Sequence, residues 1–231
     1  YDVLYSEAER RSEERIRTDI SATAFAISKP NIKLHTQAKW MSLAAIDSFF
    51  SWTEHVFILL AIIQCRCSSG NAVATLAMAN WSTKFKAALD ISDPETKKFY
   101  DELLLIRQQL RNFVAHGAFG KDGEAFSFHS RCGAVPVRLP YQSNSANFRF
   151  GHGIEFVDRE ALELLKRFEE HVWAGPRAPA KMYIQEHGLP LILTMAASGG
   201  DYERAMTSVE NMQEFSDHLG QEMDRYANMD F

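Results

Sequence analysis

The chain has 231 residues, of which 46% are hydrophobic, 24% charged and 12% aromatic. These proportions are typical of a globular protein with a substantial core, and they exclude disordered, collagen-like and disulfide-scaffold classes. The formal net charge of −5 argues against a protein that coats nucleic acid through overall positive charge, although it leaves room for a local basic site.

The N-terminal segment from Ser6 to Ser28 predicts one amphipathic helix. Its apolar stripe steps by four, four and three residues through Ile16, Ile20, Ala24 and Ile27. Opposite charges four residues apart predict ion pairs on a solvated helix face. These pairs are Glu7 with Arg11, Arg10 with Glu14, and Glu13 with Arg17. Pro30 then interrupts the helical pattern, since proline lacks the amide donor.

Two further helices follow, and the first is the most apolar part of the chain. The segment Thr36–Cys65 is apolar over much of its circumference, which is typical of the central helix of a bundle. Asp47, Glu54 and His55 interrupt its apolar run, so we expect a buried helix and no membrane span. The next helix is expected over Ala72–Leu89.

The fourth predicted helix, Glu95–His116, has the clearest boundaries. Asp93 and Pro94 have the pattern of an N-cap followed by the first helical position. The apolar residues step by four, three, four and three through Phe99, Leu103, Ile106, Leu110 and Phe113. Gly117 suits a left-handed C-cap.

Alternating apolar and polar residues over 124–156 predict two or three short antiparallel strands inserted between helices. A fifth helix is expected from Asp158, a suitable N-cap, to Trp173. The sequence around Gly175 and Pro176 then predicts a boundary. We therefore expect a helical bundle with its β insert over 1–175 and a C-terminal extension over 176–231.

The extension carries the acidic charge of the chain. It holds nine acidic and four basic residues, whereas the first 175 residues are balanced. An acidic helix is expected over 201–226. Two interpretations stay open: this helix docks on a basic cleft or on a partner protomer, or it is a solvated face that promotes solubility.

Three cysteines, Cys65, Cys67 and Cys132, are too few for a disulfide framework and predict reduced intracellular thiols. No second pair of ligands accompanies the first two, so we expect no metal site. Neither a Walker loop nor a G-x-G-x-x-G motif is present, so we expect no cofactor. With no signal-like segment at the start, the chain is expected to be cytoplasmic.

The end of the fourth helix holds the residues best suited to chemistry. Asn112 and His116 are one helical turn apart on one face, and we expect the long side chain of Arg111 to reach the same patch. Arginine presents planar donors to phosphate oxygens, and histidine transfers protons near neutral pH. This grouping suits an RNA phosphodiester attacked by its own 2′-hydroxyl, with His116 moving protons, Arg111 stabilising charge, and Asn112 orienting the ring or phosphate.

Two core helices followed by a helix that ends in R-N-x-x-x-H-G resemble the HEPN superfamily (higher eukaryotes and prokaryotes nucleotide-binding). Its hallmark is R-x(4–6)-H, often with a polar residue directly after the arginine, as Asn112 is here. The resemblance covers roughly residues 34–175. It implies a mainly α fold: a HEPN-like up-and-down helical bundle with a small antiparallel β insert and a C-terminal helical extension. The insert and the extension depart from the family pattern, which leaves the subfamily open.

The resemblance also implies a function. Family members include metal-independent endoribonucleases of toxin, abortive-infection and CRISPR systems, which typically dimerise so that both Arg–His pairs meet in one cleft. It therefore implies a homodimer, RNA as substrate, and a partner such as an antitoxin or another defence component. The alternative is a non-catalytic module that binds RNA or a nucleotide, or that serves as a dimer interface. A helical scaffold without ligands is the third interpretation.

Three further residues are weaker candidates for binding substrate. Glu54 and His55 interrupt an apolar helix, where an unpaired charge would be costly. The alternative for Glu54, which we favour, is an ion pair with a neighbouring Lys or Arg. Arg107 precedes Arg111 by one turn and would extend a phosphate-binding surface, although a solvated charge there needs no function.

Overall fold

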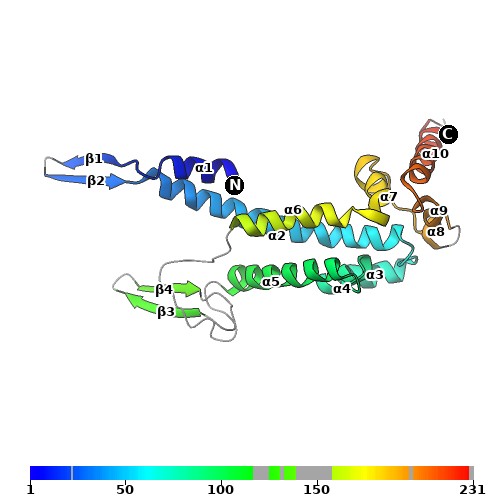
Figure 1. Ribbon diagram of the computed structural model, residues 1–231, viewed down its shortest axis with the longest axis horizontal. Helices are drawn as coiled ribbons and strands as arrows, with labels where there is room; N and C mark the ends of the chain where they lie inside the picture. Colours follow the sequence, from blue (N-terminus) through cyan, green and yellow to red (C-terminus); the bar gives the residue numbers. More distant parts are fainter. Residues whose placement is uncertain (22, 117–124, 131–132, 139–157, 198–199, 229–231) are drawn as a thin grey trace. The chain divides into compact units, whose positions relative to one another are not determined.

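The computed structural model describes residues 1–21, 23–116, 125–130, 133–138, 158–197 and 200–228; within these, the side chains of 109–138, 158 and 197 are outside the description. The protein is mainly α-helical, as predicted (Figure 1). The chain forms two compact units. Unit 1 is Tyr1–Phe49 with Gln108–Leu164, and unit 2 is Phe50–Arg107 with Leu165–Phe231. Each unit is described by itself below.

Unit 1 begins with a short helix and a hairpin instead of the single helix expected over Ser6–Ser28. Helix α1 spans Asp2–Arg10, and strands β1 (Ile16–Ser21) and β2 (Ala24–Ser28) pair in antiparallel fashion. The helix prediction is therefore wrong beyond Arg10. Ile16, Thr18 and Ile20 alternate with charged residues, and β-branched residues at period two favour a strand. The spacing of the apolar residues is compatible both with the helical period of about 3.6 residues and with the strand period of two.

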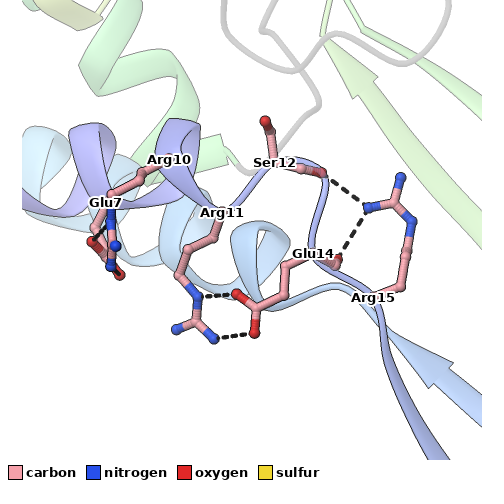
Figure 2. Close-up of polar contacts among 6 residues, drawn as sticks. All are labelled: Glu7, Arg10, Arg11, Ser12, Glu14 and Arg15. Carbon is pink, nitrogen blue, oxygen red and sulfur yellow. Dashed lines mark hydrogen bonds and ion pairs between the residues drawn. The ribbon is translucent and has the colours of Figure 1, made fainter.

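The ion pairs in this region also differ from those expected. Glu7 binds Arg10 at 2.7 Å and Arg11 binds Glu14 at 2.8 Å, so each pair spans three residues instead of four (Figure 2). Arg15 donates to two backbone carbonyl groups of the turn, each at 3.0 Å. These contacts stabilise the turn that joins α1 to β1. All are at the surface, where ion pairs contribute little stability.

Helix α2 spans Pro30–Ile63 and begins six residues earlier than expected. Proline is well suited to the first helical position, since its missing donor would be unsatisfied there in any case. In unit 1, α1 packs on the start of α2. Ala8 and Ala38 are buried, and the rings of Tyr5 and His35 meet edge to face with centroids 5.3 Å apart.

By length and composition alone, α2 is apolar enough to cross a membrane. However, half of its most apolar window is buried inside the protein, which is what the core helix of a bundle also shows. The helix therefore gives only weak evidence for a membrane span, and its burial agrees with the expected central helix.

In unit 2, the helix expected over Ala72–Leu89 is divided into α3 (Gly70–Met78) and α4 (Trp81–Ala88). The break lies at Asn80, whose side-chain oxygen accepts a hydrogen bond from the Thr83 amide at 2.9 Å. Asparagine is a preferred N-cap, so the residue that ends the continuous pattern also starts the new helix.

The core of unit 2 is built from aromatic side chains. Trp81 of α4 lies against Phe57 of α2, and Phe85 against Phe168 of α6, with ring centroids 5.7 Å apart in both pairs; all four are fully buried. Helix α6 spans Asp158–Val172, one residue shorter than expected. The Trp81 indole donates to the Thr53 hydroxyl at 2.9 Å, which satisfies its only polar group.

Helix α5 spans Pro94–His116, and its predicted start is confirmed. The Asp93 carboxylate accepts a hydrogen bond from the Thr96 amide at 2.8 Å, as an N-cap does. The expected C-cap, Gly117, lies outside the described residues. Beyond it, β3 (Ala125–Ser130) and β4 (Gly133–Arg138) form an antiparallel hairpin, which confirms two of the inserted strands. The third candidate, 147–150, also lies outside.

The C-terminal extension folds into short helices. They are the 3-10 turn η1 (Gly175–Arg177), α7 (Ala178–Lys181), the π-helical η2 (Met182–Glu186), α8 (Leu193–Ala197), α9 (Asp201–Ala205) and α10 (Val209–Ala227). The prediction of a single helix over 201–226 is wrong, because Ser208 caps a new helix: its side-chain oxygen accepts a hydrogen bond from the Asn211 amide at 3.1 Å.

The core of the extension contains two buried tyrosines, Tyr183 and Tyr202. The Tyr183 hydroxyl donates to the Pro190 carbonyl, and the Tyr202 hydroxyl accepts from the Ile192 amide, both at 2.8 Å.

Helix α2 ends in a backbone conformation that is unusual for its residue type. Cys65 has a φ of +57°, in the left-handed region. Its amide donates to the Ile62 carbonyl, and the Arg66 amide donates to the Ala61 carbonyl, both at 2.9 Å. This is the Schellman pattern, in which glycine is the usual residue at the left-handed position. A cysteine in this conformation is strained, because its Cβ atom lies close to a backbone carbonyl oxygen, whereas glycine has no Cβ atom.

We expect Cys65→Gly to relieve this strain and raise the free energy of unfolding by about 0.5–1 kcal/mol. Cys65→Ala, which removes the thiol but keeps Cβ, should stay close to the wild type. Cys67→Gly is the matched control: this buried residue does not have a positive φ, so the substitution should destabilise. Urea unfolding followed by circular dichroism measures all three. Equal stabilities for the Gly and Ala variants at position 65 would contradict the strain.

Candidate functional site

The motif residues Arg111, Asn112 and His116 lie in the last turns of α5. The backbone is helical through His116, the last described residue of this segment, so the predicted helix is confirmed as far as His116 and its predicted end there stays a prediction. The side chains of all three lie outside the described residues. Their predicted roles in binding and catalysis therefore stay predictions.

The helical backbone does define their angular spacing. At about 100° per residue, Asn112 and His116 are about 40° apart around the axis, whereas Arg111 and His116 are about 140° apart. Arg111 shares a face instead with Arg107, one turn earlier. The three motif positions therefore do not form a single stripe: positions 112 and 116 share one side of the helix, and position 111 lies in line with position 107.

Arg107, one turn before the motif in the sequence, belongs to a charged network in unit 2. The two carboxylate oxygens of Glu54 bind Lys84 at 2.6 Å and Arg107 at 3.1 Å. The Lys84 side chain is only 7% exposed, while Glu54 and Arg107 are each about a third exposed. Helices α2, α4 and α5 supply one member each. One carboxylate thus balances two cations, which leaves the network with a net charge of +1.

This network accounts for two of the weaker candidates. Glu54 forms the ion pairs that its alternative interpretation expected, and both a Lys and an Arg are its partners. Arg107 is not simply a solvated charge, because it is partly buried against that carboxylate. His55, the third candidate, is exposed on α2. The predicted contacts of these residues with a substrate stay predictions.

A second polar contact in unit 2 was not found from the sequence. His171, in the last turn of α6, shares a hydrogen bond of 2.8 Å between its Nε2 atom and the Thr96 hydroxyl. The imidazole is 12% exposed and lies on the Phe99 ring, with centroids 4.9 Å apart. The signal in the sequence was weak: a histidine three residues after Phe168 and seven after Leu164, at the edge of the apolar stripe of the helix.

The surroundings of His171 favour its neutral form. Burial lowers the pKa of the imidazole, and the nearby Arg177 cation lowers this pKa further, while the Glu95 and Asp93 carboxylates partly oppose both effects. Arg177 is held close because its guanidinium donates to the backbone carbonyls of Val172 at 2.9 Å and His171 at 2.7 Å. It thereby caps the carbonyl end of α6. We interpret this contact as structural.

The cysteines do not assemble a metal site in the described part of the chain. Burial raises the pKa of both the Cys65 and the Cys67 thiol, which disfavours the thiolate that metals and electrophiles require. Across the described residues, no three His, Cys, Asp or Glu side chains group closely enough to hold a metal ion. Cys132 lies outside those residues.

One groove in unit 2 has the volume of a small-ligand site but not its chemistry. It measures about 660 Å³ and is lined by α6, α7 and η2, with Trp173 at its wall. Lys166 and Lys181 alternate with Glu169 and other acidic residues along it. Because charges of both signs line an open surface, the groove selects no single class of charged ligand.

Comparisons with protein families, with curated proteins and with solved structures find no match for this chain. The proposals below therefore depend on the residues and their geometry.

The Glu54 network predicts an asymmetric response to substitution. Glu54→Gln leaves the buried Lys84 ammonium without its counterion, and we expect a loss of about 2 kcal/mol in unfolding free energy, less than for a fully buried pair because Glu54 is partly exposed. Adding Lys84→Met should recover part of that loss, since it removes the uncompensated charge.

The matched control is Asp101→Asn, which breaks an exposed pair with Lys97 at 2.8 Å and should cost no more than about 0.5 kcal/mol. Chemical denaturation of these proteins, together with the Lys84→Met single variant that completes the double-mutant cycle, measures the effect. Additive losses in the double variant would show that the pair carries no coupling.

The neutral state of His171 predicts a pH dependence. Because the native pKa is below that of the unfolded chain, about 6.5, the stabilisation is complete above that pH and is lost as the pH falls through it. We expect His171→Gln to remove part of the decline in unfolding free energy between about pH 7.5 and 5.5. One proton accounts for at most about 1.4 kcal/mol per pH unit of that decline.

The control is the variant His218→Gln, which replaces an exposed histidine and should keep the wild-type profile. Identical profiles for all three proteins would contradict the prediction.

Proposed function

We propose that the chain is a homodimeric, metal-independent endoribonuclease of the HEPN type, with Arg111, Asn112 and His116 as its catalytic residues. The observation that carries the proposal is the R-N-x-x-x-H pattern in the last turns of a long amphipathic helix within a mainly α-helical protein. The chemistry of the three residue types supports it, since together they supply a phosphate fork, an amide and a proton carrier.

The proposed reaction is an internal transesterification of RNA. The 2′-hydroxyl oxygen forms a bond to the adjacent phosphorus, and the bond from phosphorus to the 5′-oxygen of the next nucleotide breaks. His116 accepts the 2′-hydroxyl proton as a neutral imidazole, and the imidazolium so formed delivers that proton to the departing 5′-oxygen. The products are a 2′,3′-cyclic phosphate and a 5′-hydroxyl. Arg111 stabilises the charge that develops on the phosphate oxygens, and Asn112 orients the imidazole or the phosphate.

The helix geometry makes a second copy of the chain useful to this mechanism. Arg111 and His116 are about 140° apart around α5, so a single helix presents them in different directions. A dimer would let an arginine from one copy and a histidine from the other act on the same phosphate. The basic face that Arg107 begins supports binding of the polyanionic backbone on the same helix.

The weaker candidates have supporting roles in this proposal. Arg107 would contact a phosphate outside the cleaved bond, with Glu54 holding it in place through the 3.1 Å ion pair. His55, exposed on α2, would contact the RNA backbone. The cellular setting that fits such an enzyme is cytoplasmic toxin or anti-phage defence, with an antitoxin or another defence protein as partner.

The alternative is a non-catalytic module that binds RNA or a nucleotide, or that serves as a dimer interface. The network around Lys84 favours this alternative in one respect: its net positive charge supports phosphate binding without supplying a proton carrier. Salt-sensitive RNA binding without any product would identify the module.

The test is cleavage of a labelled single-stranded RNA in EDTA. We expect wild-type protein to give fragments with 2′,3′-cyclic phosphate ends, and Arg111→Ala and His116→Ala each to lower the rate about 100-fold or more. The matched control is Lys98→Ala, which removes an exposed cation from the same helix and should retain the wild-type rate.

Cleavage that persists equally in the wild type and in an Arg111→Ala/His116→Ala double variant would come from a contaminant, and it would overturn the enzyme proposal. Circular dichroism spectra that match the wild type would exclude misfolding as the reason for lost activity.

A further inference from the structure

Hairpin β1–β2 of unit 1 exposes both of its strands to solvent. Every residue of both strands is exposed, and the described chain adds no third strand to the sheet. Four large apolar side chains are therefore open to solvent: Ile16 (42% exposed), Ile20 (71%), Phe25 (51%) and Ile27 (59%). An isolated two-stranded hairpin is only marginally stable in water, so a partner would stabilise it.

The two edges of this hairpin differ in whether a further strand can pair with them. The β1 edge carries the charged residues Arg17 and Asp19, and its register shifts between Asp19 and Ser21. Charges and a bulge are the features by which proteins block an edge strand from pairing. The β2 edge, Ala24–Ser28, has five residues in regular register and no charge. Only β2 is open to strand addition.

The sequence of β2 also indicates which strand it accepts. It reads Ala-Phe-Ala-Ile-Ser, so small and large residues alternate symmetrically about Ala26. In an antiparallel pair centred on Ala26, Phe25 of one copy lies opposite Ile27 of the other, and small residues lie opposite small ones. Such aromatic and β-branched pairs stabilise sheets. The strand is therefore complementary to itself.

We propose that two copies of this chain associate through β2, forming a four-stranded sheet in the order β1-β2-β2-β1 about a twofold axis at Ala26. In the register of the hairpin, Phe25 and Ile27 lie on the same face of the sheet as their partners Asp19 and Arg17. In the dimer, Phe25 and Ile27 of both copies meet at the centre of that face and form an apolar cluster. The Arg17–Asp19 pair, at 2.9 Å, and the Arg17 guanidinium, 4.2 Å from the centre of the Phe25 ring, form a polar rim on each side.

The same geometry limits the assembly to two copies. After pairing, both outer edges of the sheet are β1 strands with their charges and bulge, so no further strand adds. A closed twofold dimer follows, instead of a fibre. Two five-residue strands bury a small area, so we expect association that depends on concentration. The inference does not depend on the proposed ribonuclease activity.

Cysteine cross-linking of the full chain tests the edge and the register together. Ala26→Cys places a thiol on the twofold axis, opposite its own copy, at the Cβ separation of directly opposed residues. The matched control is Thr18→Cys, because Thr18 is the direct partner of Ala26 across the hairpin and lies on the protected strand. After mild oxidation, non-reducing gels should show a covalent dimer for the Ala26 variant, and only the background of the native cysteines for the Thr18 variant.

Sedimentation of charge variants gives an independent measurement. Phe25→Lys with Ile27→Lys places like charges opposite one another across the axis, and we expect the dimer dissociation constant to rise about tenfold or more. Ile20→Lys, on the other strand and even more exposed, should leave that constant unchanged. A cross-link from position 18 instead of 26, equal cross-linking from both, or a monomer at every concentration would overturn the proposal.

Discussion

Burial of the Lys84 ammonium group is the constraint on which the arrangement of unit 2 depends. A cation that is 7% exposed is stable only beside a carboxylate, and Glu54 supplies one at 2.6 Å. Because Glu54 also binds Arg107, α2, α4 and α5 are linked through one residue. The aromatic cluster around Trp81 fills the adjacent space, so apolar packing supplies the stability while the charges determine which residues of the three helices face one another.

Helix α5 contributes to this well-packed region and also carries the R-N-x-x-x-H motif. Its first turn is held by the Asp93 cap and by the contact between Thr96 and His171, and its middle by Arg107. The last turns carry the motif. These contacts hold the part of the helix that belongs to unit 2, up to Arg107. The proposed function and the non-catalytic alternative both depend on the motif sequence that follows it.

The proposed self-association has a different origin. It depends on edges: one strand of the N-terminal hairpin is protected by Arg17, Asp19 and a bulge, and the other has no protection. Proteins generally block exposed edges, so an unblocked edge next to a blocked one is a specific feature. The ribonuclease proposal and the hairpin proposal both call for a second copy of the chain, but they use different residues and are therefore independent.

Local interactions explain what the sequence by itself determined: the mainly α-helical class, the N-cap of α5 at Asp93 and the β3–β4 hairpin. The candidacy of Arg111, Asn112 and His116 likewise comes from the sequence alone. Where two local patterns competed, the prediction was wrong. The even spacing of Ile16 and Ile20 fitted both a helix and a strand. The caps at Asn80 and Ser208 divided helices whose apolar periodicity continues across the break. The identity of the partners of Glu54 and the lowered pKa of His171 were decided only by the tertiary structure, because burial and partners 30 to 75 residues away in the chain leave no trace in local spacing.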